Sequence, residues 1–188
     1  ADDSKILSYK SDKFTYPIVI KPNFQGSTLG LSIVRDKNEI YEAIKLASIY
    51  SNNIIVEEFI DGKELTVGIL GNQALEIVEI KPKSGFYDYD SKYTKGATEY
   101  ISPAEIEPSI SKIVKKNALN IYKAIGCRHY ARVDFLLKNE DSTPYMLEVN
   151  TLPGLCSTSL LPMSANSKGI EFEELVNLIV NFALAENN

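Results

Sequence analysis

Histidine and cysteine are scarce in this sequence and tryptophan is missing from it, which limits the chemistry that the chain can perform. Its 188 residues include one histidine, two cysteines and no tryptophan. A single His129 leaves almost no material for a triad with a histidine base or for a metal site with several histidines. Cys127 and Cys156 lack C-x-x-C spacing, and two isolated thiols fit a reducing compartment, so we expect a cytoplasmic protein. Catalysis must then rest on carboxylates, lysines, arginine and backbone groups.

Long apolar runs are also absent. No stretch approaches the roughly 20 apolar residues that span a bilayer, and the polar start of the chain lacks the apolar core of a signal peptide, so we expect no membrane partner. The net charge of −5 argues against a protein that grips a nucleic-acid backbone. With 44% hydrophobic and 24% charged residues, the composition is that of a globular protein with one compact domain or two small lobes.

Apolar periodicity predicts a succession of strands and helices. Runs of β-branched and aromatic residues predict strands over residues 16–22, 31–34, 54–59, 65–70, 75–80, 132–137 and 145–149. A period of 3.6 predicts a helix after Asp36, with Glu39 completing a capping box, and further helices over residues 109–125 and 171–185. Asp61-Gly62 predicts a hairpin between the strands 54–59 and 65–70. The aromatic-rich segment 84–99 predicts a lid loop.

Polar residues interrupt the apolar pattern of the strands around Asp134 and Glu148. Because strands have a period of two, three residues share one face of each strand: Arg132, Asp134 and Leu136 on the first, and Met146, Glu148 and Asn150 on the second. A turn centred on Asp141 places Asp134 across from Glu148. Two close carboxylates repel, so a divalent cation between them is expected, and Mg²⁺ takes carboxylates, phosphate oxygens and water. A surface ladder or a plain Arg–Asp ion pair is the alternative.

Two other segments have features of a nucleotide site. Lys21 ends a strand and precedes a loop with Gly26 and Gly30, in which backbone amides could approach phosphate oxygens. The loop lacks the G-K-[ST] ending of a Walker A motif, so an ordinary hairpin loop is the alternative. The segment 54–60 could offer its backbone to an adenine edge and Glu64 its carboxylate to a ribose, although exposed acids on edge strands are common.

Taken together and in order, five segments resemble the D-alanine–D-alanine ligases, a family of ATP-grasp enzymes, over residues 16–183. The segments are Ile20-Lys21-Pro22 with Gly26-Ser27-Thr28-Leu29-Gly30, Val56-Glu57-Glu58-Phe59-Ile60 with Glu64-Leu65-Thr66-Val67, Gly85-Phe86-Tyr87-Asp88-Tyr89 with Lys92-Tyr93, Arg132-Val133-Asp134, and Leu147-Glu148-Val149-Asn150-Thr151-Leu152-Pro153-Gly154. The resemblance implies an α+β ATP-grasp fold, with two lobes of mainly antiparallel sheet and packed helices enclosing a nucleotide cleft. Residues 1–60 would form part of the central lobe, and residues 61–188 the carboxy-terminal catalytic lobe.

The same resemblance implies an activity and residue roles. The activity is ATP-dependent joining of two D-alanines through an acyl phosphate, for peptidoglycan precursors, by a full-length enzyme that is a homodimer. ATP would be bound by Lys21, Glu57, Glu58, Phe59, Ile60, Glu64 and Lys92. Mg²⁺, or Mn²⁺, would be held by Asp134, Glu148 and Asn150. Arg132 would stabilise the acyl phosphate and the tetrahedral oxyanion, with Ser27 and Tyr93 in a hydrogen-bonded set between loop and lid. The second D-alanine would be seated by Gly154, Ser159 and Leu160.

The sequence also departs from the family. The amino-terminal domain, which supplies a glutamate for the first D-alanine, and the start of the central lobe with its early lysine are missing, so we expect a fragment that is incomplete as a ligase. The segment Leu155-Cys156-Ser157-Thr158 stands where the family more often has Met-Thr-Ser-His, which could alter the second-substrate pocket. The alternatives are another ATP-grasp carboxylate–amine ligase, such as a D-alanine–D-serine ligase, and a nucleotide-binding fragment without catalysis.

Overall fold

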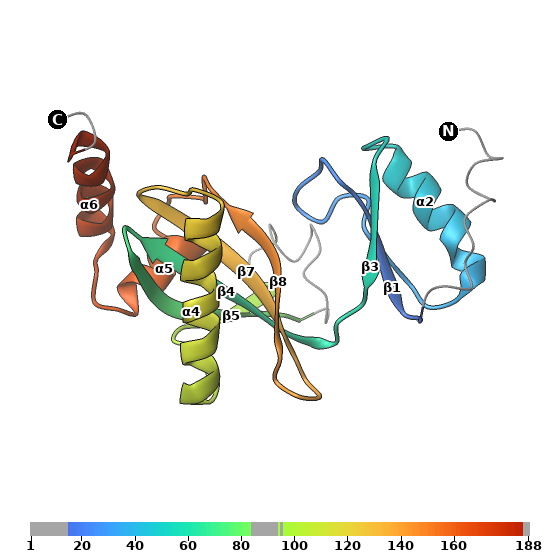
Figure 1. The fold of residues 1–188 in the computed structure, drawn as a ribbon, viewed down its shortest axis with the longest axis horizontal. Coiled ribbons are helices and arrows are strands. Elements are labelled where there is room, and N and C mark those ends of the chain that lie inside the picture. Colours follow the sequence, from blue (N-terminus) through green and yellow to red (C-terminus); the bar gives the residue numbers. More distant parts are fainter. Residues whose placement is uncertain (1–14, 84–93, 95, 186–188) are drawn as a thin grey trace. The chain divides into compact units, whose positions relative to one another are not determined.

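Figure 1 shows the fold of the computed structural model, which describes residues 15–83, 94 and 96–185. The chain forms two compact units, one from residues 1–60 with 82–98 and the other from residues 61–81 with 99–188. Each unit contains a sheet of its own, of three strands in the first case and five in the second. The pairings of β1 with β2 and β3, and of β4 and β7 with their neighbours, are antiparallel, as an α+β fold with mainly antiparallel sheet requires.

The first unit has its strands in the order β2-β1-β3. Its elements are β1 (Ile18–Pro22), β2 (Ser32–Val34), the 3₁₀ turn η2 (Lys37–Glu39), α2 (Ile40–Ser48) and β3 (Ile54–Glu58). The core lies between the sheet and α2 and comprises Ile18, Ile20, Val34, Ala43 and Ala47. Asp36 caps the helical segment as predicted, because its Oδ1 accepts a hydrogen bond from the N–H of Asn38 at 2.7 Å. Glu39 does not complete the predicted capping box, since its Oε2 accepts from the N–H of Arg35 at 2.8 Å instead of that of Asp36.

The second unit has its strands in the order β6-β5-β4-β7-β8. They are β4 (Gly62–Leu70), β5 (Gln73–Pro82), β6 (Thr98–Ile101), β7 (Tyr130–Lys138) and β8 (Pro144–Asn150), and the helices are α4 (Pro108–Ala124), α5 (Leu160–Asn166) and α6 (Phe172–Ala185). Ile69 and Leu70 are neighbours on β4 and so point to opposite faces of the sheet. Ile69 packs in a cluster with residues of α4, and Leu70 in another with residues of α5 and α6. Helices therefore cover parts of both faces.

The predicted hairpin through Asp61-Gly62 is wrong. β3 pairs with β1 in the first sheet, with Ile20 opposite Val56, and β4 pairs with β5 and β7 in the second sheet. Gly62 is the first residue of β4 rather than part of a two-residue turn. The apolar side of β3 packs against the cluster beneath α2, so burial of that side decides its partner and overrides the local turn signal.

Two short elements and one irregularity escaped the sequence analysis. α5 was not predicted. Its Pro162 lies in the first turn, where the missing N–H of a proline costs nothing. β6 begins at Thr98, inside the segment predicted as a lid. Strict alternation predicts Met146 on the same face as Glu148. A bulge in β8 instead places Met146 opposite Phe135.

Within the described residues, no helix is both long and apolar enough to cross a bilayer.

Candidate functional site

The hairpin of β7 and β8 pairs the predicted site residues, although its turn is not the predicted one. Next to the turn, Leu137 lies opposite Pro144, one residue off the register of a turn centred on Asp141, and the bulge in β8 restores that register at Asp134. Asp134 lies opposite Glu148 and Arg132 opposite Asn150, and the bulge interrupts the ladder only beyond Asp134. Because paired residues of an antiparallel ladder point to the same face, all four side chains emerge together. The next pair, Val133 and Val149, points to the opposite face, where both pack in or against the cluster that includes α4.

Asp134 is the centre of this group. Arg132 donates to both carboxylate oxygens, from Nε to Oδ1 at 2.9 Å and from Nη2 to Oδ2 at 2.8 Å. Asn150 Nδ2 donates to Asp134 Oδ2 at 2.9 Å, and to Glu148 Oε1 at 3.3 Å. One amide group thus bridges the two acids, and the fork of Arg132 balances the charge of the more buried one. Both the Arg–Asp ion pair and the acid pair expected from the sequence occur in the same cluster.

The charges of this cluster suit a partner that brings positive charge and accepts oxygen ligands. Two carboxylates and one guanidinium leave an excess of one negative charge, and Glu148 is exposed. Nowhere in the described part of the chain do three or more His, Cys, Asp or Glu side chains gather in a way that could hold a metal ion. The protein donors here are two acids and an amide, which form an open set of hard oxygen ligands rather than a closed metal cage.

Thr66 is a member of the cluster that the sequence analysis did not single out. It lies on β4 opposite Asp134, and its Oγ1 donates to Asp134 Oδ1 at 2.5 Å. Thr66 is fully buried, and so are its two neighbours Leu65 and Val67, which are apolar core residues. A lone hydroxyl between two buried aliphatic residues is a weak signal in the sequence, and the 68 residues that separate Thr66 from Asp134 hide the contact.

The predicted nucleotide contacts of the first unit include a close ion pair. Lys21 Nζ lies 2.6 Å from Glu57 Oε1, across the neighbouring strands β1 and β3. Glu58 is exposed, and Phe59 and Ile60 are half-buried. The Phe59 N–H donates to the Pro17 carbonyl at 3.2 Å, so this backbone donor is already engaged. The structure thus brings Lys21 and Glu57 together. The contacts of these residues with a nucleotide stay predictions.

The loop after Lys21 has an unusual backbone. Ser27, Thr28 and Gly30 have positive φ angles of 55°, 64° and 74°, and left-handed conformations at two residues with side chains indicate a loop held by its surroundings. A Cβ on Gly30 would lie 2.6 Å from Cδ2 of Tyr50. Tyr50 therefore packs directly over the glycine and supports the loop that carries Ser27.

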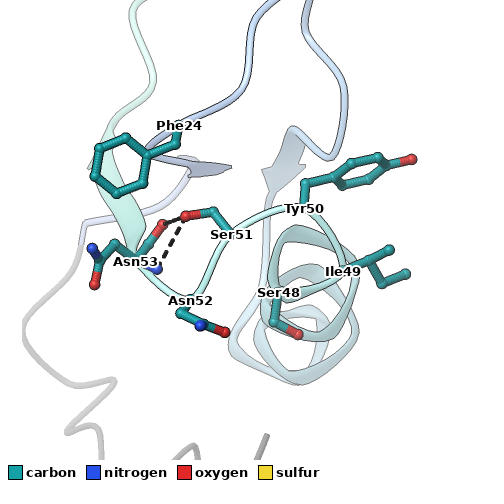
Figure 2. Close-up of a pocket in the computed structure, with 7 residues that line it drawn as sticks. All are labelled: Phe24, Ser48, Ile49, Tyr50, Ser51, Asn52 and Asn53. Carbon is teal, nitrogen blue, oxygen red and sulfur yellow. Dashed lines mark hydrogen bonds between the residues drawn. The ribbon is translucent and has the colours of Figure 1, made fainter.

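A shallow pocket of about 380 Å³ lies beside this loop. It is lined by Phe24 and by residues 48–53, which form the end of α2 and the turn after it, and Figure 2 shows the side chains of Phe24 and Tyr50 on opposite sides of Ser51. Ser51 folds the turn on itself, because its Oγ donates to the Asn53 carbonyl and accepts from the Asn53 N–H. The lining contains no charged residue, so the pocket lacks the groups expected of a phosphate site.

The residues predicted to seat the second substrate lie in the segment after β8 and at the start of α5. Leu160 begins α5 and is buried. Ser159 Oγ accepts from the Cys156 N–H at 3.3 Å and lies 3.0 Å from Cys156 Sγ. A Cβ on Gly154 would also lie 3.0 Å from this Oγ, so the turn is tight. The hydrogen bonds from Ser159 and Thr158 lower the pKa of the exposed Cys156 thiol.

The remaining predicted site residues are Glu64, Lys92 and Tyr93, of which the structure describes only Glu64. Glu64 lies on β4, opposite Leu136 and two residues before Thr66, and is half-buried. Alternation places it on the same face as Thr66 and Asp134. Lys92 and Tyr93, with most of the predicted lid, lie outside the described residues.

Comparison with known proteins identifies the family. The family model described as "D-ala D-ala ligase C-terminus" matches residues 1–181. A D-alanine–D-alanine ligase of Methylacidiphilum infernorum is 45% identical over 174 residues, which are 93% of this chain and 57% of the relative. Another, from Fervidobacterium nodosum, is 43% identical over 186 residues, covering 97% of this chain and 58% of the relative. The chain thus spans a little over half the length of these curated relatives.

Solved structures agree. The VanG D-Ala:D-Ser ligase from Enterococcus faecalis superposes with a TM-score of 0.81 at 34% identity, covering 91% of this chain and 50% of that one. A D-alanine–D-alanine ligase from Bacillus anthracis complexed with ATP gives a TM-score of 0.79 at 33% identity, covering 95% and 56%. These matches confirm the expected ATP-grasp fold. By its match to the family model, its relatives and its fold, the chain belongs to the D-alanine–D-alanine ligase family and corresponds to the carboxy-terminal part of that family's proteins.

Proposed function

We propose that this chain carries the ATP-binding and catalytic part of a ligase that joins D-alanine to a second D-alanine through an acyl phosphate. The observation that carries the proposal is the cluster of Arg132, Asp134, Glu148 and Asn150 on one face of the β7–β8 hairpin. A protein that only bound nucleotide would have little need for an arginine fixed beside the acids. ATP is supported by the solved relative that is complexed with it.

In the proposed reaction, the carboxylate of the first D-alanine takes the γ-phosphoryl group of ATP, releasing ADP. The amine of the second D-alanine then attacks the acyl carbon, loses a proton, and expels phosphate to leave the dipeptide. Negative charge develops on oxygen in both steps, so fixed positive groups contribute most to catalysis. Arg132 would stabilise the acyl phosphate and the oxyanion, and Lys21 the phosphates of ATP.

Asp134, Glu148 and Asn150 would hold Mg²⁺, or Mn²⁺, which supplies charge neutralisation at the phosphates. The donor set fits, because Mg²⁺ prefers one or two carboxylates completed by phosphate oxygens and water. Asn150 now turns its Nδ2 toward both acids. Half a turn about its Cβ–Cγ bond would present Oδ1 instead, and the two ends of an amide have nearly the same shape. Mg²⁺ would also offset the repulsion between the carboxylates of Asp134 and Glu148, to both of which Asn150 now donates.

Other roles follow the family pattern residue by residue. For the nucleotide, Glu57 and the backbone of residues 58–60 would contact adenine, Glu64 would contact the ribose, and Lys92 would reach the phosphates. Ser27 and Tyr93 would form hydrogen bonds that link the loop to the lid. The second amino acid would be seated by Gly154, Ser159 and Leu160. The structural similarity to a D-Ala:D-Ser ligase makes D-serine the second candidate for that amino acid. A cytoplasmic location and, for a full-length enzyme, a homodimer complete the proposal.

The test is calorimetric titration of the 188-residue chain with a non-hydrolysable ATP analogue, with and without Mg²⁺. Binding that requires Mg²⁺ supports the ATP and cation sites. A folded chain that binds no analogue under either condition contradicts the assignment of nucleotide binding to these residues. A parallel assay tests the choice of product. It uses a full-length enzyme that contains this 188-residue segment and compares D-alanine with D-serine as the second substrate.

A further inference from the structure

The four hydrogen bonds to Asp134 are not equivalent. Three come from Arg132 and Asn150, which lie on β7 and β8 with their side chains partly exposed. The fourth comes from Thr66 on β4, a strand paired on both sides, and Thr66 has no exposed surface. Among the described donors to Asp134, the fully buried one, Thr66, therefore lies on a different strand from Arg132 and Asn150.

We propose that Thr66 is a positioning residue of this site, whose buried hydroxyl fixes the orientation of the Asp134 carboxylate toward Glu148 and Asn150. It touches neither substrate nor nucleotide in this scheme and acts through Asp134. The proposal rests on the function proposed above only where cation binding is used to measure the effect.

The number of donors supports this role. A carboxylate offers about four lone-pair sites, and Thr66, Arg132 and Asn150 together provide four hydrogen bonds to them. A cation that coordinates Asp134 must therefore displace one of these donors. Arg132 and Asn150 can turn toward water, whereas a displaced Thr66 hydroxyl would be buried without a partner, which is costly. Thr66 is thus the contact that remains when a ligand replaces another.

The geometry of threonine suits the task. Thr66 and Asp134 are directly opposite in the ladder, so the hydroxyl needs no long flexible arm to reach Oδ1. A β-branched side chain in a strand has a restricted χ1 angle, which holds the donor in one direction. Valine has the same shape without the hydroxyl, and serine keeps the hydroxyl without the branch.

The experiment compares Thr66→Val with Thr66→Ser in the 188-residue chain. Ser164→Ala is the matched control, because Ser164 is also a fully buried hydroxyl of this unit but bonds to the backbone of Gly68 and Glu76 instead of an acid. The first readout is the apparent affinity for Mg²⁺ in the presence of the ATP analogue. The second, without metal, is protection of the Arg132 Nε–H from hydrogen exchange by ¹⁵N NMR, with thermal unfolding measured for every variant.

Loss of a residue that orients a metal ligand typically lowers metal affinity about 10- to 100-fold, and this is the range expected for Thr66→Val. The same variant should lose protection at Arg132, while Thr66→Ser stays close to the parent in both readouts. Ser164→Ala should lower the unfolding temperature without altering either. Unchanged protection and affinity in Thr66→Val, or losses equal to those of Ser164→Ala, would overturn the proposal.

Two complications have their own controls. If the parent chain shows no Mg²⁺ dependence, the metal assignment fails, and Arg132 protection alone decides the role of Thr66. If Thr66→Val does not fold, Thr66→Cys replaces it, because a thiol is a similar but weaker donor. Arg132 protection in Thr66→Cys should then fall below that of Thr66→Ser, and equal protection in the two would overturn the proposal.

Discussion

The side chains of Lys21 and Glu57 form an ion pair, with 2.6 Å between Nζ and Oε1, across the neighbouring strands β1 and β3. Both are proposed nucleotide contacts, Lys21 for phosphate and Glu57 for adenine. Without nucleotide they bind each other, so the lysine is held near its proposed site instead of extending into water. Binding of a phosphate would exchange one anionic partner of Lys21 for another.

Replacing Lys21 by methionine should weaken nucleotide binding much more than it weakens the fold. Loss of a hydrogen bond to a charged group costs about 1.5–3 kcal/mol, which corresponds to a roughly tenfold to hundredfold rise in the Kd of the ATP analogue. Half-exposed ion pairs contribute less than about 1 kcal/mol to stability. Calorimetry and urea unfolding measure the two effects. Lys45→Met, which removes a surface ion pair with Glu42 in the same unit, should change neither.

Glu148→Gln should separate cation-dependent from cation-independent binding. The variant keeps the shape of the side chain but removes a charged ligand, so the Kd of the analogue with Mg²⁺ should rise roughly tenfold or more while the Kd without metal stays near the parent value. Titrations of the parent and variant with and without Mg²⁺ provide the comparison. Glu140→Gln, an exposed acid paired with Lys138 near the turn of the same hairpin, is the control. Equal losses with and without Mg²⁺ would contradict the metal assignment.

Gly30→Ala should destabilise the first unit, and Gly26→Ala should not. Gly30 has a φ of 74°, and a Cβ would lie 2.6 Å from Tyr50 Cδ2, whereas no described residue lies within 4 Å of a Cβ on Gly26. The left-handed conformation alone costs an alanine about 1–2 kcal/mol, and the clash adds to it. Urea unfolding of both variants measures the difference. A Gly30→Ala protein as stable as Gly26→Ala would show that Tyr50 does not hold the loop.

Cys156 should react with thiol reagents at lower pH than an ordinary cysteine. The hydrogen bonds from Ser159 and Thr158 lower the pKa of its thiol, and the thiolate is the nucleophile. Its alkylation rate should therefore rise with pH through a midpoint below the usual thiol value, and Ser159→Ala should move that midpoint upward. Burial raises the pKa of Cys127, which should react at higher pH. Mass spectrometry after iodoacetamide labelling at a series of pH values distinguishes the two sites.

The sign of the linked effect on folding follows from the same shift. A thiol whose pKa is lower in the folded protein than in the unfolded chain favours folding above the unfolded pKa, and this contribution is lost as the pH falls through the folded pKa. An unfolding series over that range should show the trend in the parent and less of it in Ser159→Ala. The raised pKa of Cys127 contributes the opposite trend in both proteins, so the difference between them measures the contribution of Cys156. Identical pH dependences in the parent and Ser159→Ala would place the Cys156 thiol outside the hydrogen bonds described.

Some features could be predicted from the sequence because they depend on residues close together in the chain. The shared face of Arg132 with Asp134, and of Glu148 with Asn150, follows from the period of a strand, whereas the opposition of Asp134 and Glu148 also depends on the bulge in β8. The apolar stripes of α2, α4 and α6 and the cap formed by Asp36 before η2 are equally local. The bulge that moved Met146 was not predictable in this way, because one extra residue in a strand leaves no distinct pattern.

The sequence by itself determined the family and most of the strands and helices, since ordered motifs and periodicity are properties of neighbouring residues. Only the tertiary structure decided that β3 joins β1 instead of β4, and that Thr66 supplies the buried hydrogen bond to Asp134. Both depend on which strands lie side by side. That choice is made by burying apolar faces from distant parts of the chain, and no local pattern records it.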